Sequence, residues 1–335
     1  MTPRIALALI SGGLDSILAA RLAAEMPGLI IVGYHFYHPF EGGIAPDGLS
    51  AAERAAFTAG VSIIEESDDA AFIDMIINAK LGRGKGANPC RDCRLFILRR
   101  AARMLDKIGG DFLITGEVVG QRPMSQIRNH MNQIENLSGV KGLIVRPLCG
   151  ALLPPTTPEQ RGWITRESLL DFQGRNRKPQ IALARKFGIT DYPNPAGGCA
   201  LTQTAYAKRF LDMMKWGDKI DARQVALLRF GRHYRLPDGL KLIIPRDEAE
   251  SEKALALASG ELWILAYDEI PGPIAILNRA PDNDEITTTA SLVASYGKYR
   301  NNVSVGMILE SPDGSVRKFD VRPANKEDFR EYLID

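Results

Sequence analysis

Three cysteines have spacings that suit chemistry. Cys90 and Cys93 lie in NPCRDCR, at the expected start of a helix rich in arginine, and Cys199 follows two glycines in NPAGGCAL. A helix N-terminus and nearby cations stabilise thiolates, the reactive and metal-binding form of cysteine. In a reducing compartment, such cysteines are more often catalytic or metal-binding than disulfide-bonded. We therefore expect nucleophilic catalysis or metal binding from these three thiols.

A second group of polar residues, SGGLDS, follows the apolar run RIALALI. Glycines let backbone N–H groups turn inward toward an anion, and the helix that follows adds its positive N-terminal end. Asp15 suits such a pocket if it orients a group or holds Mg²⁺ between phosphates. The stretch lacks the GK[ST] ending of a Walker P-loop and the third glycine of the dinucleotide fingerprint. The residues expected to hold phosphate are Ser11, Gly12, Gly13, Leu14, Asp15 and Ser16.

Short apolar runs alternate with helical patterns in the first half of the chain, and these elements must position both groups. The runs are almost continuously apolar, as buried parallel strands are, and they cover residues 4–10, 29–36, 61–66, 111–118 and 142–148. Apolar residues recur at helical spacing in residues 14–26, 52–60, 69–80 and 93–109. The alternation predicts an α/β fold with a doubly wound parallel sheet, whose ligand lies at the carboxyl ends of the strands.

The motifs together resemble a known family. SGGLDS after the first strand is similar to the signature of the PP-loop ATP pyrophosphatases, which cleave ATP to AMP and pyrophosphate while adenylating a carbonyl oxygen. With NPC..C, GGC and TGEVVGQRPMSQ, the chain resembles the tRNA thiouridine synthetases, and in particular a bacterial group of stand-alone, thiouridylase-like PP-loop proteins. That group shares GKG.NPC..C, RPL, GR.RKPQ and PAGGC.LT in this order. The resemblance covers residues 4–215 and continues through FGRHYRL, without the N-terminal RNA-binding extension or rhodanese-like tail of other members.

The resemblance implies an adenine nucleotide alpha hydrolase-like fold and ATP-dependent thiolation of a tRNA uridine. A uridine carbonyl oxygen would be adenylated with release of pyrophosphate, with Mg²⁺ as the ion of the nucleotide, and sulfur would then displace AMP. Catalysis would rest on Cys90, Cys93, Cys199 and Asp15.

Two sulfur routes stay open. The three cysteines would hold a [4Fe–4S] cluster with an open iron for sulfide, or one cysteine would carry a persulfide that another resolves. The sulfur donor would accordingly be sulfide or a persulfide carrier. Zinc held by the three cysteines with Cys149 or a histidine is a third alternative. Cys149 follows a strand in RPLCG and otherwise suits a small buried side chain.

Further residues are expected around the nucleotide and the RNA. The resemblance implies that Gly116 and Glu117 frame the nucleotide and that His35 and Phe36 lie near adenine, although core aromatics at a strand end fit YHF equally well. Polar and basic side chains expected to contact the target base or the tRNA are Lys85, Gln121, Arg122, Ser125, Gln126, Arg175, Arg177, Lys178 and Arg232. Solvated loops would explain the basic residues as well.

The pattern changes to strands and hairpins after about residue 220. Asp-Gly pairs separate apolar runs at 227–245 and 305–321. We expect a PP-loop domain at 1–217 and a smaller α+β domain, RNA-binding in character, at 218–335. Residues 204–246 hold ten Lys/Arg against four Asp/Glu, although the net charge is only +2. A local basic face of this kind suits a polyanion.

The composition and the remaining hypotheses set the limits of this interpretation. A chain of 335 residues with 45% hydrophobic and 24% charged residues is typical of globular proteins. No window approaches the roughly 18 apolar residues of a membrane span, so we expect a cytoplasmic protein without a membrane partner, and a homodimer stays open. The two other hypotheses are a PP-loop ligase or amidotransferase with a structural zinc site, and a non-catalytic RNA-binding sensor.

Overall fold

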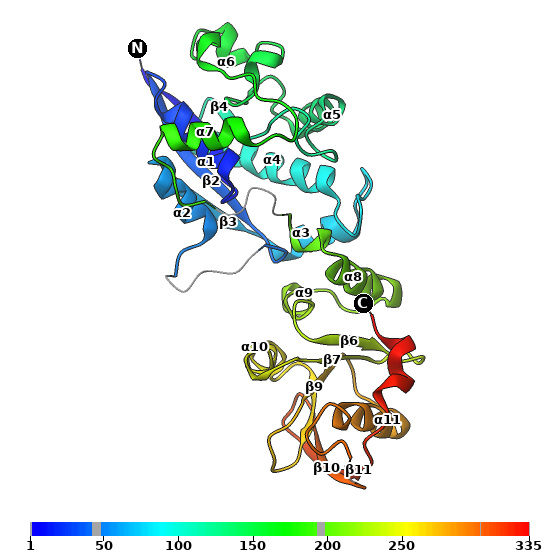
Figure 1. The fold of residues 1–335 in the computed structure, drawn as a ribbon. Helices are drawn as coiled ribbons and strands as arrows, with labels where there is room; N and C mark the ends of the chain where they lie inside the picture. Colours follow the sequence, from blue (N-terminus) through cyan, green and yellow to red (C-terminus); the bar gives the residue numbers. More distant parts are fainter. Residues whose placement is uncertain (1, 42–47, 193–197, 302, 335) are drawn as a thin grey trace. The chain divides into compact units, whose positions relative to one another are not determined.

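The computed structural model describes residues 2–41, 48–192, 198–301 and 303–334. The chain divides into two compact units, Met1–Cys199 and Ala200–Asp335 (Figure 1). The division falls earlier than the predicted boundary at 217, because the helix α8 (Thr204–Trp216) belongs to the second unit.

The first unit contains a parallel five-stranded sheet, as predicted. The strand order is β3-β2-β1-β4-β5, and every neighbouring pair is parallel. The strand order reverses between β1 and β4, so the carboxyl ends of these two strands form the switch point where such sheets bind ligands. The strands are β1 (Arg4–Leu9), β2 (Leu29–Tyr37), β3 (Ser62–Ser67), β4 (Phe112–Thr115) and β5 (Ile144–Val145).

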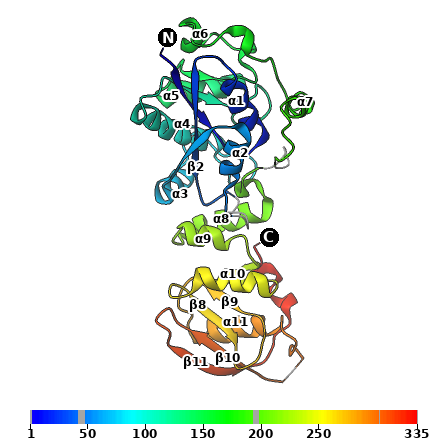
Figure 2. The same cartoon turned by 90° about the vertical axis from the view of Figure 1, so that its left-hand side faces the viewer.

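Helices cover both faces of this sheet (Figure 2). Alternate residues of β1, among them Ala6 and Ala8, pack with α1, α2 and α7 in one apolar cluster. The opposite face carries α4, which packs against α3 and α5. The helices are α1 (Leu14–Ala24), α2 (Ala51–Ala59), α3 (Asp69–Ile77), α4 (Cys90–Lys107), α5 (Arg128–Ser138), α6 (Thr157–Gln160) and α7 (Lys178–Lys186), with short 3₁₀ turns at Gly150–Leu152 and Arg166–Ser168.

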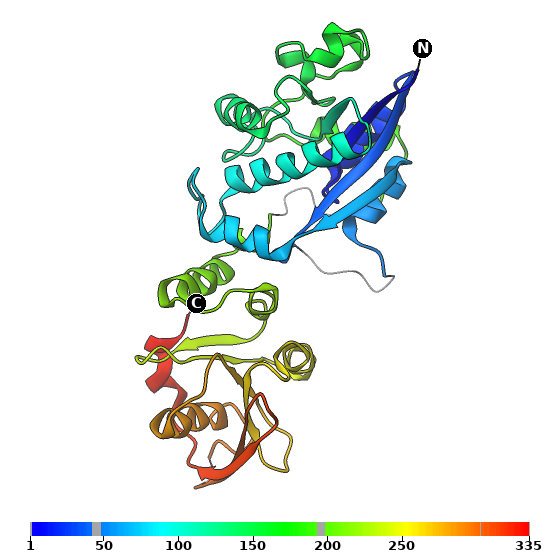
Figure 3. The same cartoon turned by 180° about the vertical axis from the view of Figure 1, so that it is seen from behind.

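The second unit is an α+β domain around an antiparallel six-stranded sheet (Figure 3). The hairpins predicted from the Asp-Gly pairs are present as β6-β7 and β10-β11. Leu242 and Ile244 face α11, whereas Ile243 between them faces α10, so these helices cover opposite faces of the sheet. The strands are β6 (Arg232–Arg235), β7 (Lys241–Ile244), β8 (Trp263–Tyr267), β9 (Ala275–Leu277), β10 (Val305–Glu310) and β11 (Val316–Val321).

The remaining helices of this unit are α9 (Ala222–Leu227), α10 (Glu248–Ala258) and α11 (Asn283–Ala294), with 3₁₀ turns at Ala200–Thr202 and Lys326–Tyr332. Among the described helices, none combines the length and the apolar character that a membrane crossing requires.

Candidate active site

The glycine loop, residues 11–16, connects β1 to α1. Helix α1 begins at Leu14, and its N-cap Gly13 provides no side-chain hydrogen bond. The Ser16 hydroxyl turns back to donate to the Gly13 carbonyl at 2.7 Å and accepts from the Ser11 N–H at 3.2 Å. The N–H groups that open α1 therefore suit an anion, as the positive end of the helix does.

Two glycines allow the loop to approach its neighbours closely. Gly12 has a φ of +76°, and a Cβ there would lie 2.8 Å from the Cβ of Ala51. A Cβ on Gly116, which follows β4, would lie 2.5 Å from the backbone carbonyl of Asp15. Larger residues would therefore push the loop away from α2 and from β4. The contact at Gly116 joins the ends of β1 and β4 at the switch point.

Asp15 is held by side chains from two distant segments. Its Oδ2 accepts from Gln121 Nε2 at 2.6 Å and from Arg177 Nη1 at 2.7 Å. Gln180, which is only 1% exposed, donates from Nε2 to Gln121 Oε1 at 2.9 Å. Asp15 Oδ1 is buried and has no hydrogen-bond partner among the described residues. One carboxylate oxygen is therefore fixed by the protein, while the other is left for a ligand.

Residues 119–126 and 173–180 meet because their backbones pair. The Gly174 N–H donates to the Val119 carbonyl at 2.7 Å and joins the two segments, while the Gly120 N–H donates to the Gln126 carbonyl at 2.7 Å and closes the first segment on itself. The two segments thus carry Gln121 and Arg177 to the glycine loop.

The nine residues predicted to contact RNA are placed in different environments. Gln121 and Arg177 contact Asp15, and Ser125 and Gln126 are buried. Gln180 was missed by the sequence analysis, although GRNRKPQ contains it. The exposed members of the set, whose contact with RNA stays a prediction, are Lys85, Arg122, Arg175 and Lys178.

Glu117 is the centre of a buried ion network. Its carboxylate accepts from Arg94 Nε at 2.9 Å, from Arg146 Nε at 3.0 Å and from the Thr115 hydroxyl at 3.0 Å. Arg146 also donates to Glu135 at 2.9 Å. Burial alone would raise the pKa of Glu117, but the two guanidinium groups outweigh burial and lower the pKa to about 2. Because this carboxylate is occupied, the prediction that Glu117 frames a nucleotide rests on its backbone.

Two of the candidate cysteines lie in the first turn of α4, and the third affects one of them electrostatically. Cys90 is the first residue of α4. Burial raises the pKa of the Cys93 thiol, and the neighbouring Cys199 and Cys90 raise it further. Cys199, the last residue of the first unit, therefore lies within electrostatic reach of the CxxC pair. In the described chain, no two cysteines form a disulfide.

One side chain contacts the CxxC pair directly, and a second leads from the pair toward β4. Asn88, which is 6% exposed, donates from Nδ2 to Cys90 Sγ at 3.0 Å. Arg94 follows Cys93 and reaches Glu117, the neighbour of Gly116, so a short path of contacts joins the thiols to the glycine loop. The sequence analysis did not predict that Asn88 contacts Cys90, although this asparagine is part of the NPC motif.

His35 and Phe36 take part in the packing of the first unit. His35 is 5% exposed, and its Nδ1 lies 2.8 Å from the Ile10 carbonyl oxygen while Nε2 lies 3.2 Å from Glu41. Burial lowers the pKa of His35, but the hydrogen bond and charge of Glu41, the hydrogen bond to Ile10 and the charge of Glu65 together outweigh burial, so the net shift is upward. Phe36 stacks with Phe72 at 5.7 Å between ring centroids. These positions suit core side chains at a strand end, and adenine contact stays a prediction.

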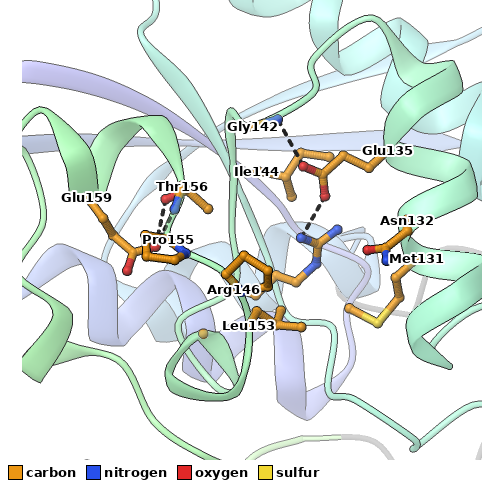
Figure 4. Close-up of a pocket in the computed structure, with 12 residues that line it drawn as sticks. Met131, Asn132, Glu135, Gly142, Ile144, Arg146, Leu153, Pro155, Thr156 and Glu159 are labelled. Atoms are coloured by element: carbon orange, nitrogen blue, oxygen red, sulfur yellow. Dashed lines mark hydrogen bonds and ion pairs between the residues drawn. The ribbon is translucent and has the colours of Figure 1, made fainter.

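Figure 4 shows a cavity of about 120 Å³ beside Arg146. Glu135, Thr156 and Glu159 line it, and none of its lining residues belongs to the glycine loop or is a cysteine. A second hollow of about 190 Å³ adjoins the glycine loop at Gly12. Its other lining residues are Ile17, Ala51, Arg54, Ala55, Asp191 and Tyr192. Of the two hollows, this one is placed to take part of a ligand held by the loop.

Cys149 is fully buried, and its contacts do not include the other three cysteines among the described residues. It packs with Val119 and Met131, and its Sγ donates to the Glu117 carbonyl at 3.1 Å. Burial raises its pKa to about 11. It therefore behaves as a small core side chain.

Asp15 suits a metal ion, whereas the three cysteines as placed do not. The buried Asp15 Oδ1, with no partner among the described residues, is the kind of oxygen that Mg²⁺ binds. Three thiolates are a donor set for an iron–sulfur cluster. In the described residues, however, no group of three or more His, Cys, Asp or Glu side chains is arranged to hold a metal ion. The thiols as placed therefore do not fit a cluster or a zinc site.

In the second unit, the basic run FGRHYRL divides into buried and accessible residues. Arg235 is 7% exposed and donates to Asp212 at 2.6 Å, to Asp218 and to the Gly239 carbonyl. Arg232 lies 4.9 Å from the ring centroid of Tyr296. Arg235 is thus part of the packing, whereas Arg232 is only partly buried and its contact with RNA stays a prediction.

Comparison with known proteins bears mainly on the second unit. Residues 231–333 match the family model described as the NFACT protein RNA binding domain. No curated protein matches the chain at the significance required.

Several solved structures resemble the chain at low identity. A 4-thiouridine synthetase in complex with RNA and ATP has a TM-score of 0.39 and 18% identity, over 68% of this chain and 51% of the synthetase, so the chain spans about half of that protein. The predicted subunit of tRNA methyltransferase from Methanocaldococcus jannaschii has a TM-score of 0.29 and 18% identity, over 43% and 69% of the two chains. The C-terminal part of the fibronectin/fibrinogen-binding protein from Streptococcus suis has a TM-score of 0.28 and 12% identity, over 79% and 98%. With every score below 0.5, the fold assignment rests on the strand order of this chain, with a parallel five-stranded sheet in the first unit and an antiparallel six-stranded sheet in the second.

Proposed function

We propose that this protein is an ATP-dependent tRNA uridine thiolase. The first unit would activate a uridine carbonyl oxygen with ATP and replace it with sulfur, and the second unit would bind the RNA. The observation that carries the proposal is the CxxC pair at the start of α4, where Arg94 beside Cys93 reaches Glu117 at the end of β4 next to the glycine loop. The electrostatic effect of Cys199 on the pKa of Cys93 supports it.

The glycine loop would hold the phosphates of ATP. The N–H groups that open α1 and the Ser11 hydroxyl supply donors, and the Ser16 hydroxyl shapes the loop through its bond to the Gly13 carbonyl. The hollow beside Gly12 offers room for another part of the nucleotide. Mg²⁺ held between Asp15 Oδ1 and the phosphates would neutralise their charge. Gln121 and Arg177 would keep Asp15 aimed at this position through its other oxygen.

The first chemical step is adenylation. The uridine carbonyl oxygen attacks the α-phosphorus, a new O–P bond forms, and the bond to the β-phosphate oxygen breaks with release of pyrophosphate. The protein contributes position and charge neutralisation, because the reacting bonds belong to the substrates. AMP attached to the base is a far better leaving group than the original oxygen.

Sulfur transfer would follow from a cysteine persulfide. The terminal sulfur attacks the activated carbon and expels AMP, which leaves the base joined to the enzyme by a disulfide. A second thiolate attacks the cysteine sulfur of that bond, releases the thiouridine and forms a protein disulfide, which an external thiol must reduce. We assign the persulfide to Cys90, because Asn88 donates a hydrogen bond to its sulfur and α4 begins there.

RNA capture would belong to the second unit. The match of residues 231–333 to the NFACT RNA-binding domain supports this role. The exposed basic residues around GRNRKPQ and GQRPMSQ would contact RNA on the first unit.

The test uses the purified chain with ATP, Mg²⁺, a persulfide donor, a thiol reductant and tRNA. We expect tRNA-dependent formation of AMP and pyrophosphate, and a thiouridine detected by mass spectrometry of digested tRNA. Cys90→Ser and Cys199→Ser should abolish the thionucleoside while they leave adenylation measurable. Cys149→Ser is the matched control and should keep both activities.

Three results would contradict the proposal. A thionucleoside yield unaffected by both Cys90→Ser and Cys199→Ser would remove the sulfur route. Turnover of ATP with a small molecule but with no tRNA would favour a ligase. RNA binding without ATP turnover on any tRNA would favour a sensor.

A further inference from the structure

We propose that the RNA-contacting surface of the second unit is the tyrosine turn, residues 295–300, together with Arg232 of β6. The turn follows α11 and reads SYGKYR. The inference rests on the proposed RNA capture and goes further by assigning it to a surface that combines exposed cations with exposed aromatic rings.

The tyrosine turn is held in one conformation by the domain beneath it. The Tyr267 hydroxyl donates to the Ala294 carbonyl at 3.0 Å, and the Tyr296 and Gly297 N–H groups each donate back into the end of α11 at 3.1 Å. A Cβ on Gly297 would lie 2.1 Å from the Tyr267 hydroxyl oxygen, so the turn fits only with glycine there. A surface held this firmly loses little conformational entropy when it binds.

Tyr296 joins the turn to β6. Its hydroxyl is hydrogen-bonded to the hydroxyl of Tyr234, and the Arg232 guanidinium lies 4.9 Å from its ring centroid. A guanidinium stacked on a ring keeps its outward N–H groups available for phosphate. Arg232 therefore adds a preoriented cation to the edge of the turn.

The last three residues of the turn, Lys298, Tyr299 and Arg300, face solvent. Tyr299 is 38% exposed and packs edge-on against Tyr267 at 6.3 Å between centroids. Lys298 and Arg300 are exposed. Within the described chain, neither these two nor Arg232 lies in an ion pair with a carboxylate.

Other cations of this unit are already matched by acidic groups. Arg235 pairs with Asp212 at 2.6 Å and also with Asp218. Arg246 pairs with Glu250 at 3.0 Å, Arg279 with Glu285 at 2.5 Å and Lys318 with Asp268 at 2.9 Å. The basic excess at 204–246 in the sequence is thus partly used inside the fold. In the turn and at Arg232, aromatic surface coincides with cations that lie in none of the ion pairs of the described residues.

This combination fits RNA that has an unpaired base. Three cations would contact backbone phosphates, while Tyr299 would stack on a base, which is a mode of binding that tolerates many sequences. An acidic protein surface would use the cations but would gain little from the ring, so the aromatic variants below distinguish the two partners.

The test measures the affinity of the full chain for fluorescently labelled tRNA by anisotropy, at several salt concentrations. We expect Tyr299→Ala to weaken binding about tenfold with little change in salt dependence, because stacking is not electrostatic. Tyr299→Phe should bind as the parent does. The double variant Lys298→Ala/Arg300→Ala should lower the slope of log K against log salt by roughly 0.7 for each cation removed.

Lys253→Ala is the control, since Lys253 is exposed on α10, on the opposite face of the sheet. It should change neither affinity nor slope, and circular dichroism should show that every variant is folded. If tRNA binds the parent but Tyr299→Ala and the double variant bind equally well, or Lys253→Ala is as impaired as they are, this surface is wrong and the proposed function stands. If the parent binds no RNA, both fail.

Discussion

Arg177 Nη1 lies 2.7 Å from Asp15 Oδ2, although the two residues are 162 positions apart in the chain. Arg177 comes from the segment GRNRKPQ, which the sequence analysis assigned to RNA contact, and Asp15 comes from the glycine loop. The pairing places this segment beside the glycine loop. A basic segment that the sequence predicts to contact RNA therefore also holds a side chain of the glycine loop.

Replacement of Arg177 should impair ATP chemistry more than stability. The ion pair is partly open to solvent, with side chains 20% and 14% exposed, so its loss should cost below about 1 kcal/mol of unfolding free energy. Arg177→Ala should lower kcat/KM for AMP formation about 10- to 100-fold, because Asp15 loses a fixed direction. Lys186→Ala, an exposed cation in the last turn of α7, should leave this rate unchanged. Equal rates for Arg177→Ala and the parent would contradict the role.

Gln180 should act on Asp15 through Gln121. Gln180→Leu leaves Gln121 Oε1 without its buried donor, which should cost about 1 to 3 kcal/mol of stability. We expect kcat for AMP formation to fall about tenfold with KM for ATP nearly constant, because Gln180 positions a group and does not touch the ligand. The exposed Gln160→Leu on α6 is the matched control. A change confined to thermal stability would reduce Gln180 to a structural residue.

Glu117 should make the protein sensitive to acid. Its pKa lies near 2, below its ordinary value of 4.5, so the charged form favours the folded state. The stabilisation is complete above about pH 4.5 and is lost as the pH falls toward 2. Glu117→Gln should cost about 3 to 5 kcal/mol at pH 7, since Arg94 and Arg146 would keep buried, poorly matched charges.

Urea unfolding of the parent and of Glu117→Gln from pH 7 down to 2.5 checks this expectation. The difference in unfolding free energy should be largest at pH 7 and should shrink below pH 4.5. Asp106→Asn, an exposed substitution on α4, should show no such trend. A difference independent of pH would refute the ion network as its source.

Arg235 and Arg232 should separate stability from RNA binding. Arg235→Ala leaves Asp212 and Asp218 facing each other without their shared cation, and it should lower the stability of the second unit by about 3 to 5 kcal/mol. Arg232→Ala should leave the thermal midpoint near that of the parent and weaken tRNA binding. Thermal unfolding followed by circular dichroism, with the anisotropy assay, measures both. An Arg232→Ala variant that unfolds as easily as Arg235→Ala would contradict the assignment of Arg235 to stability and of Arg232 to RNA binding.

Local patterns were sufficient to predict the parallel sheet, the helices around it and the two hairpins. Continuous apolar runs specify buried strands because both faces are covered, and Asp-Gly pairs specify tight turns because their backbone geometry is local. The glycine loop was recognisable for the same reason, since Gly12, Gly13 and Ser16 act within one strand–helix connection.

The sequence by itself therefore determined the elements and the groups capable of chemistry: a phosphate-type loop, three thiols and a basic run at 204–246. Only the tertiary structure decided which of these side chains meet. Asp15 is contacted by Gln121 and Arg177, and Gln180 supports Gln121. Arg235 is paired with carboxylates inside the second unit, whereas Arg232 is in no ion pair of the described residues. These contacts join distant segments, so they depend on how the chain packs. Periodicity along the chain carries information about neighbours three or four residues away, and none about a partner more than a hundred residues distant.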